Sequence, residues 1–170
     1  MVEKVNITPE VASLSVFENM SYKAWVALGE FVDNSIQSFL DNKSKIYSKT
    51  GRKKLKIEIS VTSEDGGEII ITDNAAGISN ADMKRAFRVA SRPSNNKGLS
   101  EFGMGMKVAA CWFSRNWEVA TKALNESDEK VVKVDIKKIT SKNLAEIDVK
   151  RFRANKNDCY TIVTLRKLLK

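Results

Sequence analysis

The feature that most constrains the fold is one segment near the start of the chain, residues 28–40, with the sequence Leu-Gly-Glu-Phe-Val-Asp-Asn-Ser-Ile-Gln-Ser-Phe-Leu. Glu30 and Asn34 are four residues apart, so on a helix their side chains project from the same side, one turn apart. Apolar residues at helical spacing predict a buried stripe on another face: Trp25, Leu28, Val32, Ile36 and Phe39. We therefore expect a helix over residues 22–40 that buries one face and displays an acid and an amide on another.

An acid and an amide held in this way can perform two kinds of chemistry. The Glu30 carboxylate can take a proton from water as a general base. The Asn34 amide oxygen can ligate a hard cation such as Mg²⁺, which prefers oxygen ligands and accompanies phosphate. Taken alone, the segment favours an ordinary amphipathic helix with a polar outer face, so later segments must decide between the two interpretations.

Composition and charge favour a single domain with an anionic partner. At 170 residues the chain suits one domain, 1–170, with enough buried surface for a core. The formal net charge is +8, from 29 basic and 21 acidic residues, which favours a nucleotide, a nucleic acid or an acidic surface as partner. The absence of histidine excludes His-dependent triads, His-ligated zinc and a phospho-acceptor histidine within these residues.

Nothing in the chain predicts a membrane partner. No apolar run approaches the ~18 residues that a membrane-spanning helix needs, and the first residues lack a signal-peptide pattern. We therefore expect a cytoplasmic protein, or a nuclear one in a eukaryote. Cys111 and Cys159 lie far apart and lack the spacing of metal ligands.

The rest of the chain predicts strands with short helices between them. Ser79 is expected to cap a helix that runs to about Val89, and a second short helix is expected at 108–113. Alternating or β-branched runs predict strands at 55–61, 68–72, 117–122, 131–139, 145–149 and 160–165. This order favours an α+β fold: a two-layer α/β sandwich whose mixed, mostly antiparallel sheet has helices on one face.

A basic segment separates the first helix from the first strand. Residues 41–56 are expected to end the helix and form a solvated loop. Their Lys and Arg residues are Lys43, Lys45, Lys49, Arg52, Lys53, Lys54 and Lys56. A solvated loop is the favoured interpretation, and contact with the phosphates of a nucleic acid is the alternative.

Asp73 directly follows the predicted strand at 68–72. A carboxylate fixed there can accept a hydrogen bond from the exocyclic amine of adenine, which guanine lacks at that ring position. Gly77 would let the backbone approach a flat base closely. An ordinary Asp-Asn turn after a strand is the plainer interpretation.

A glycine-rich segment precedes the helix at 108–113. Gly98, Gly103 and Gly105 would expose backbone amides at the helix start, and Lys107 adds a full positive charge, so this segment favours phosphate. The spacing matches neither a Walker loop nor a dinucleotide-binding fingerprint. A glycine-rich turn that lets a helix pack closely is the alternative.

The three segments stand in an order that resembles the GHKL superfamily: gyrase, the heat-shock chaperone of ninety kilodaltons, histidine kinases and MutL. The matching residues are Glu30-Phe-Val-Asp-Asn34, Asp73-Asn-Ala-Ala-Gly77 and Phe102-Gly-Met-Gly-Met-Lys107. Thr161 looks like the Thr of the family's final strand, and the resemblance covers residues 20 to 166. Within the superfamily the third motif is most similar to the Microrchidia-type and chaperone-type ATPases.

The resemblance implies a Bergerat-type fold that binds ATP with Mg²⁺ under a mobile lid formed by residues 90–101. It implies that Glu30 activates the attacking water, that Asn34 ligates Mg²⁺, and that Asp73 binds the adenine amine beside Gly77. Thr161 would support Asp73 through its hydroxyl. The phosphates would be held around the third motif by Gly98, Phe102, Gly103, Met104, Gly105, Met106 and Lys107. Two positions depart from the family pattern: Ala75 and Tyr160 stand where the family has glycine.

The function implied is an ATPase whose lid closure drives a conformational change or the ATP-dependent homodimerisation of a larger protein. The 170 residues would be the amino-terminal part of that protein. One alternative is an ATP-dependent binding switch with negligible turnover. The other is a histidine-kinase-like phosphotransfer module, which the lack of histidine disfavours.

Overall fold

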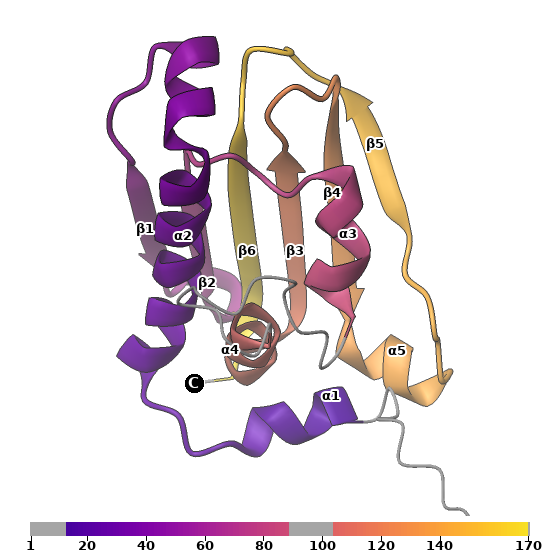
Figure 1. The fold of residues 1–170 in the computed structure, drawn as a ribbon. Coiled ribbons are helices and arrows are strands. Elements are labelled where there is room, and N and C mark those ends of the chain that lie inside the picture. The colour runs from indigo at the N-terminus through magenta and orange to yellow at the C-terminus, as the bar shows by residue number, and fades with distance from the viewer. Residues whose placement is uncertain (1–12, 89–103, 170) are drawn as a thin grey trace, which may run out of the picture.

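The computed structural model describes residues 13–88 and 104–169, and these form one antiparallel sheet with helices packed on one face (Figure 1). The strands lie in the order β1-β2-β6-β3-β4-β5, and every neighbouring pair is antiparallel. Their bounds are β1 (Ile57–Thr62), β2 (Glu68–Asp73), β3 (Ser114–Lys122), β4 (Asp128–Asp135), β5 (Val149–Arg153) and β6 (Tyr160–Leu168). The expected two-layer α+β fold is confirmed.

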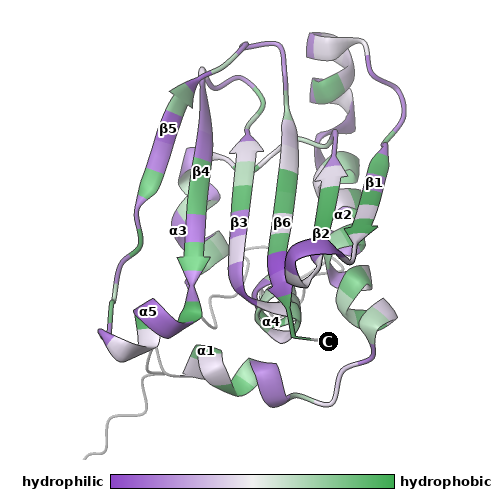
Figure 2. Ribbon diagram, turned by 180° about the vertical axis from the view of Figure 1, so that it is seen from behind, coloured by the Kyte–Doolittle hydropathy of each residue, from purple (hydrophilic) through white to green (hydrophobic). Residues whose placement is uncertain are grey.

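Three helices cover one face of the sheet: α2 (Ala24–Thr50), α3 (Asn80–Phe87) and α4 (Gly105–Phe113). Figure 2, taken from behind, shows the opposite face of the strands in front of all three. The shorter helical segments are α1 (Ser13–Val16), η1 (Phe17–Asn19), η2 (Glu64–Gly66) and α5 (Ile136–Ser141). A site on the helix-covered face is therefore enclosed between the sheet and α2, α3 and α4.

Helix α2 is longer than the sequence predicted. It continues past Leu40 to Thr50, because residues 41–50 contain neither Gly nor Pro and Ile46 is fully buried by packing. It ends at Gly51, whose φ of 71° closes the helix with a 2.8 Å hydrogen bond from its N–H to the Tyr47 carbonyl. Several lysines assigned to a loop therefore project from a helix.

The predicted buried stripe of α2 was also wrong in most of its members. Trp25 is 68% exposed, and of the five stripe residues only Phe39 is buried. The face that meets the sheet and α4 is rotated around the helix axis and consists of Ala27, Phe31, Ser35, Phe39 and Ile46. Close packing against α4 and Asp73 selects small and polar side chains at two of these positions, which a hydrophobic period does not reveal.

Two strands have bounds that differ from those predicted. The strand expected at 131–139 stops at Asp135, whose side chain accepts a hydrogen bond from the Lys138 N–H and so caps α5. The strand expected at 145–149 instead begins at Val149. The remaining strands match their predictions closely, and the β1–β2 hairpin pairs Ile59 with Ile71 as its alternation requires.

The core fixes the ends of β2 and β6 beneath the helices. Ile71, Val119 and Val163 lie side by side on neighbouring strands and are almost fully buried. Helix α4 belongs to the same core cluster, and all its residues from Lys107 to Phe113 are buried. Because Asp73 pairs with Thr161 two register positions beyond the pair of Ile71 and Val163, both residues are held at the edge of this core.

Candidate functional site

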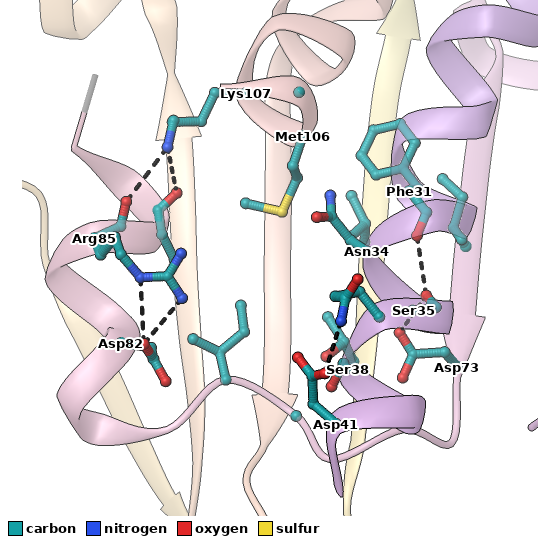
Figure 3. Close-up of a pocket in the computed structure, with 18 of the residues that line it drawn as sticks. Phe31, Asn34, Ser35, Ser38, Asp41, Asp73, Asp82, Arg85, Met106 and Lys107 are labelled. Atoms are coloured by element: carbon teal, nitrogen blue, oxygen red, sulfur yellow. Dashed lines mark hydrogen bonds and ion pairs between the residues drawn. The ribbon is translucent and has the colours of Figure 1, made fainter. Parts of the chain in front are cut away.

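A pocket of about 340 Å³ lies between α2, α3, the start of α4 and the ends of β2 and β6 (Figure 3). Its walls come from segments that are far apart in the sequence. The residues predicted from the sequence that line it are Asn34, Asp73, Gly77, Gly105, Met106, Lys107 and Thr161. The fold therefore brings members of all three motifs into one cavity.

Asp73 forms part of the pocket wall as a buried carboxylate with fixed orientation. It is 8% exposed, and burial raises its pKa. The Ser35 hydroxyl donates to Oδ2 at 2.7 Å and the Ala75 N–H donates to Oδ1 at 2.9 Å. These two bonds and one from the Thr161 backbone act against the effect of burial and lower the pKa of Asp73. Each carboxylate oxygen keeps acceptor capacity, so Asp73 can receive a further hydrogen bond from a ligand amine.

Ser35 is a site residue that the sequence analysis missed. It lies on the buried face of α2, four residues from both Phe31 and Phe39. A serine at that spacing within a buried face needs a polar partner, and here the partner is Asp73. The wrong stripe assignment hid this signal.

Thr161 belongs to a network that holds the segment after β2. Its hydroxyl lies 3.2 Å from that of Thr121, which donates to the Tyr160 carbonyl and accepts from the Ile78 N–H at 2.8 Å. The hydroxyl that donates to Asp73 in this structure is that of Ser35. Thr161 therefore lines the pocket from β6, with its hydroxyl beside that of Thr121 and not bonded to Asp73.

Gly77 is required by the packing of the same segment. Its φ is +69°, and a Cβ there would lie 2.2 Å from the Lys122 carbonyl oxygen. The pocket is therefore lined at this point by bare backbone that lies against the end of β3.

Ala75, one of the departures from the family pattern, is 1% exposed and packs in a small cluster with Phe39, Ile46 and Cys159. Arg52 fixes this corner by donating to the carbonyls of Asn74 and Cys159, both at 3.1 Å. The methyl group of Ala75 therefore fills core space behind Asp73.

Glu30 and Asn34 differ in how they relate to the pocket. The Asn34 amide nitrogen donates to the Glu30 carbonyl at 2.7 Å, and the residue lines the pocket. The Glu30 carboxylate is not part of the described lining and instead lies against Gly105, with the Tyr22 hydroxyl donating to it at 3.2 Å. Burial and the negative charge of Glu30 raise the pKa of Tyr22.

Lys107 is buried and points to the end of α3. Its ammonium donates to the carbonyls of Ala86 at 3.1 Å and Arg85 at 3.4 Å. Burial, with a smaller contribution from the charge of Arg85, lowers the pKa of Lys107 to about 8. Arg85 itself forms an ion pair with Asp82 at 2.9 Å, and both residues line the pocket although the sequence analysis had not singled them out.

Several residues that the sequence predicted for the site lie outside the part of the chain that the structure describes. Gly98, Phe102, Gly103 and the lid at 90–101 lie outside the described residues. Met104 directly precedes α4 and is half-buried.

The donor set fits a magnesium ion held mainly by a nucleotide. The described residues contain no group of three or more His, Cys, Asp or Glu side chains that could hold a metal alone. Mg²⁺ is commonly held by one or two protein oxygens together with phosphates and water. Since the Asn34 nitrogen is used within the helix, its amide oxygen is the atom available to a cation.

None of the helices in the described ranges combines the length and apolar character needed to cross a bilayer.

Comparison with known proteins agrees with the geometry. The family profile described as histidine kinase-, DNA gyrase B-, and HSP90-like ATPase matches residues 22–164, which include every described residue of the pocket lining. No curated protein matches the chain.

Proposed function

Because the chain belongs to the family of histidine kinase-, DNA gyrase B- and HSP90-like ATPases, we propose that its pocket binds ATP with Mg²⁺ and that the protein hydrolyses the bound ATP. The observation that carries this proposal is the meeting of three sequence motifs around the buried acceptor Asp73. A pocket of about 340 Å³ is of a size suited to a nucleotide.

The base end of the proposed site is built around Asp73. Its carboxylate would accept the adenine amine, and the bare backbone at Gly77 would lie against the base. Apolar side chains supply flat walls here: Phe31, Ile71, Ile78 and Val163. Without the amine the remaining acceptor capacity of the buried Asp73 carboxylate would go unused, and a carbonyl oxygen of guanine in its place would face that carboxylate, so this arrangement favours adenine over guanine.

The phosphate end would lie where α4 begins. Helix starts favour anions because their first N–H groups are free and the helix dipole is positive there. Asn34 would hold Mg²⁺ through its amide oxygen, and the bound ion would neutralise phosphate charge. Glu30, one turn before Asn34 and beside Gly105, would act as the general base on the attacking water. The lid expected at 90–101 lies outside the described residues, and its closure over the nucleotide would favour a homodimer.

A second candidate function is an ATP-dependent binding switch with negligible turnover. The observation in its favour is that the Glu30 carboxylate lies against Gly105 and Tyr22 rather than in the described pocket lining. ATP could then bind without hydrolysis until Glu30 changes its position. Phosphotransfer to a histidine would require an acceptor outside these 170 residues, which contain none.

Phosphate release measured beside calorimetric ATP binding distinguishes these functions. Wild-type protein and the Glu30→Gln variant would be compared with ATP and Mg²⁺. ATP binding with release well above that of the variant supports the ATPase. Binding with release equal to that of the variant supports the switch, and no ATP binding overturns both.

A further inference from the structure

Helix α3 presents a positively charged group to the pocket on the side across from Asn34 (Figure 3). Among the described residues that line the pocket, the basic ones are Arg85 and Lys107. A triphosphate carries several negative charges, and its affinity depends on the donors that can reach it. The two side chains differ in this respect.

The hydrogen-bonding capacity of Lys107 is largely committed to the protein. Its side chain is buried, with the residue only 3% exposed, and its ammonium donates to two carbonyls in the last turn of α3. A cation at the end of a helix is stabilised by these carbonyls. Since an ammonium has three N–H donors, these two bonds leave Lys107 one donor for a ligand.

Arg85 is held in place but keeps donors for a ligand. Its Nε and Nη2 both donate to Asp82 Oδ1, at 3.3 and 2.9 Å. Since a guanidinium has five N–H donors, these two bonds leave three. The side chain is 38% exposed, so its free donors can be reached from the pocket.

Asp82 is itself fixed, which makes the arginine a prepared group rather than a mobile one. The Ser79 hydroxyl donates to Asp82 Oδ2 at 2.7 Å, and the Asp82 N–H donates back to Ser79 Oγ at 3.2 Å. This reciprocal cap ties Asp82 to the first turn of α3. A guanidinium whose position is already set loses less conformational entropy when it binds an anion.

We propose that Arg85 is a further ligand of the nucleotide, donating to its phosphates, and that Asp82 positions it. The proposal rests on the proposed function, because it assigns a role within the same nucleotide site. A planar guanidinium suits phosphate oxygens, to which it donates in pairs. The contact predicts a specific dependence on the number of phosphates.

The test measures the affinity of the whole chain for adenosine, AMP, ADP and ATP with Mg²⁺ by calorimetry, directly or by displacement. Arg85→Gln should lower the affinity for ATP about tenfold to a hundredfold, as expected for hydrogen bonds to a charged group. Adenosine affinity should change less than about twofold, which also shows that the pocket is intact. Arg85→Lys should recover only part of the loss, because lysine keeps the positive charge but lacks the planar, paired N–H donors of the guanidinium.

Arg166→Gln is the matched control. Arg166 is also an ion-paired arginine, 3.0 Å from Glu68, but it is not part of the pocket lining. The affinities of the Arg166→Gln variant for all four ligands should equal those of the wild type. If Arg85→Gln and the wild type gain equally in affinity from adenosine to ATP, Arg85 does not bind phosphate and only this inference fails. If the wild type binds none of the four ligands, the proposed function fails with it.

Discussion

Glu30 and Gly105 lie so close that a Cβ at position 105 would be 1.8 Å from Glu30 Oε2. Gly105 was singled out from the sequence for its exposed backbone amide near a phosphate. The structure adds a second requirement, because any side chain at this position would displace the Glu30 carboxylate. The first residue of α4 and the proposed general base are therefore coupled through space.

This coupling predicts a non-additive effect on stability. Gly105→Ala should be less favourable in the wild type than where Glu30 is absent, since the new methyl group forces the Glu30 side chain to move. In a Glu30→Ala background the same change should be neutral, or stabilising by up to about 1 kcal/mol, because Ala is the better helix former. Denaturant unfolding of the four proteins gives the interaction energy. Equal effects in both backgrounds would show that the two residues do not constrain one another.

The proposed catalytic role of Glu30 predicts a separation of binding from turnover. Glu30→Gln should keep ATP affinity and lower single-turnover hydrolysis about a hundredfold, within the ~10²–10⁴ typical of general-base help. Asn34→Ala should instead lose the Mg²⁺-dependent part of the affinity as well as turnover. Rapid-quench measurements with calorimetry separate the two variants. Wild-type turnover in Glu30→Gln would remove Glu30 from the mechanism.

The lowered pKa of Lys107 predicts how ATP affinity depends on pH. Phosphate favours the charged lysine, so ATP binding should raise its pKa from about 8. Below that pH the lysine is charged with and without ATP, and it contributes no pH dependence. Above that pH the free protein has lost a proton that binding must restore, so affinity should fall by up to about tenfold per pH unit.

Dissociation constants for ATP at about pH 7 and about pH 9 test this linkage. Lys107→Arg stays charged throughout the range and should remove the dependence. A wild-type affinity that is unchanged between the two conditions would show that Lys107 does not sense the phosphates.

The basic segment at 41–56 predicts at most weak binding of nucleic acid. The structure already uses one of its charges, because Arg52 holds the corner behind Asp73. Lys53 and Lys54 are exposed. A chain with a net charge of +8 should bind duplex DNA at low salt and release it steeply as salt rises.

Gel shifts with Lys53→Gln/Lys54→Gln should show weaker binding and a shallower dependence on salt. Lys137 and Lys138 on α5 are also exposed, and their paired Gln variant is the control for net charge. No shift of DNA by the wild type at low salt would mean that the charge only keeps the protein in solution.

The parts of the fold that the sequence predicted are those set by local pattern. The β1–β2 hairpin was predictable because its period of two is fixed by the pleat, and Asp73 stood out because it follows a buried strand. The buried face of α2 was not predictable in this way. Trp25 contributes more to a hydrophobic period than Ala27 does, but of the two residues tertiary packing buries only Ala27. The strand expected at 131–139 ends at Asp135, because the side chain of Asp135 caps helix α5 although the alternation of apolar and polar residues continues beyond it.

The residues of the candidate site likewise fall into those that the sequence predicted and those that only the structure identified. Motif residues such as Asn34 could be assigned because their spacing is unusual, and the fold brought them together. Ser35 and Arg85 carry no motif: the partner of Ser35 is Asp73 on a distant strand, and the place of Arg85 in the pocket wall depends on how α3 packs. That Glu30 shares one side of the helix with Asn34 could be inferred from helical spacing, whereas its contact with Gly105 could not.

The central claim is that Asp73 reads adenine in the pocket, and calorimetry of ATP binding to the wild type and Asp73→Asn tests it most directly. The wild type should bind ATP at one site, and GTP should compete poorly. Asp73→Asn should keep the fold, since the amide oxygen can still accept from the Ala75 N–H and the amide NH2 can donate to the Ser35 hydroxyl oxygen, but should lose measurable ATP binding. ATP affinity unchanged in a folded Asp73→Asn protein, or equal competition by GTP, would contradict the account.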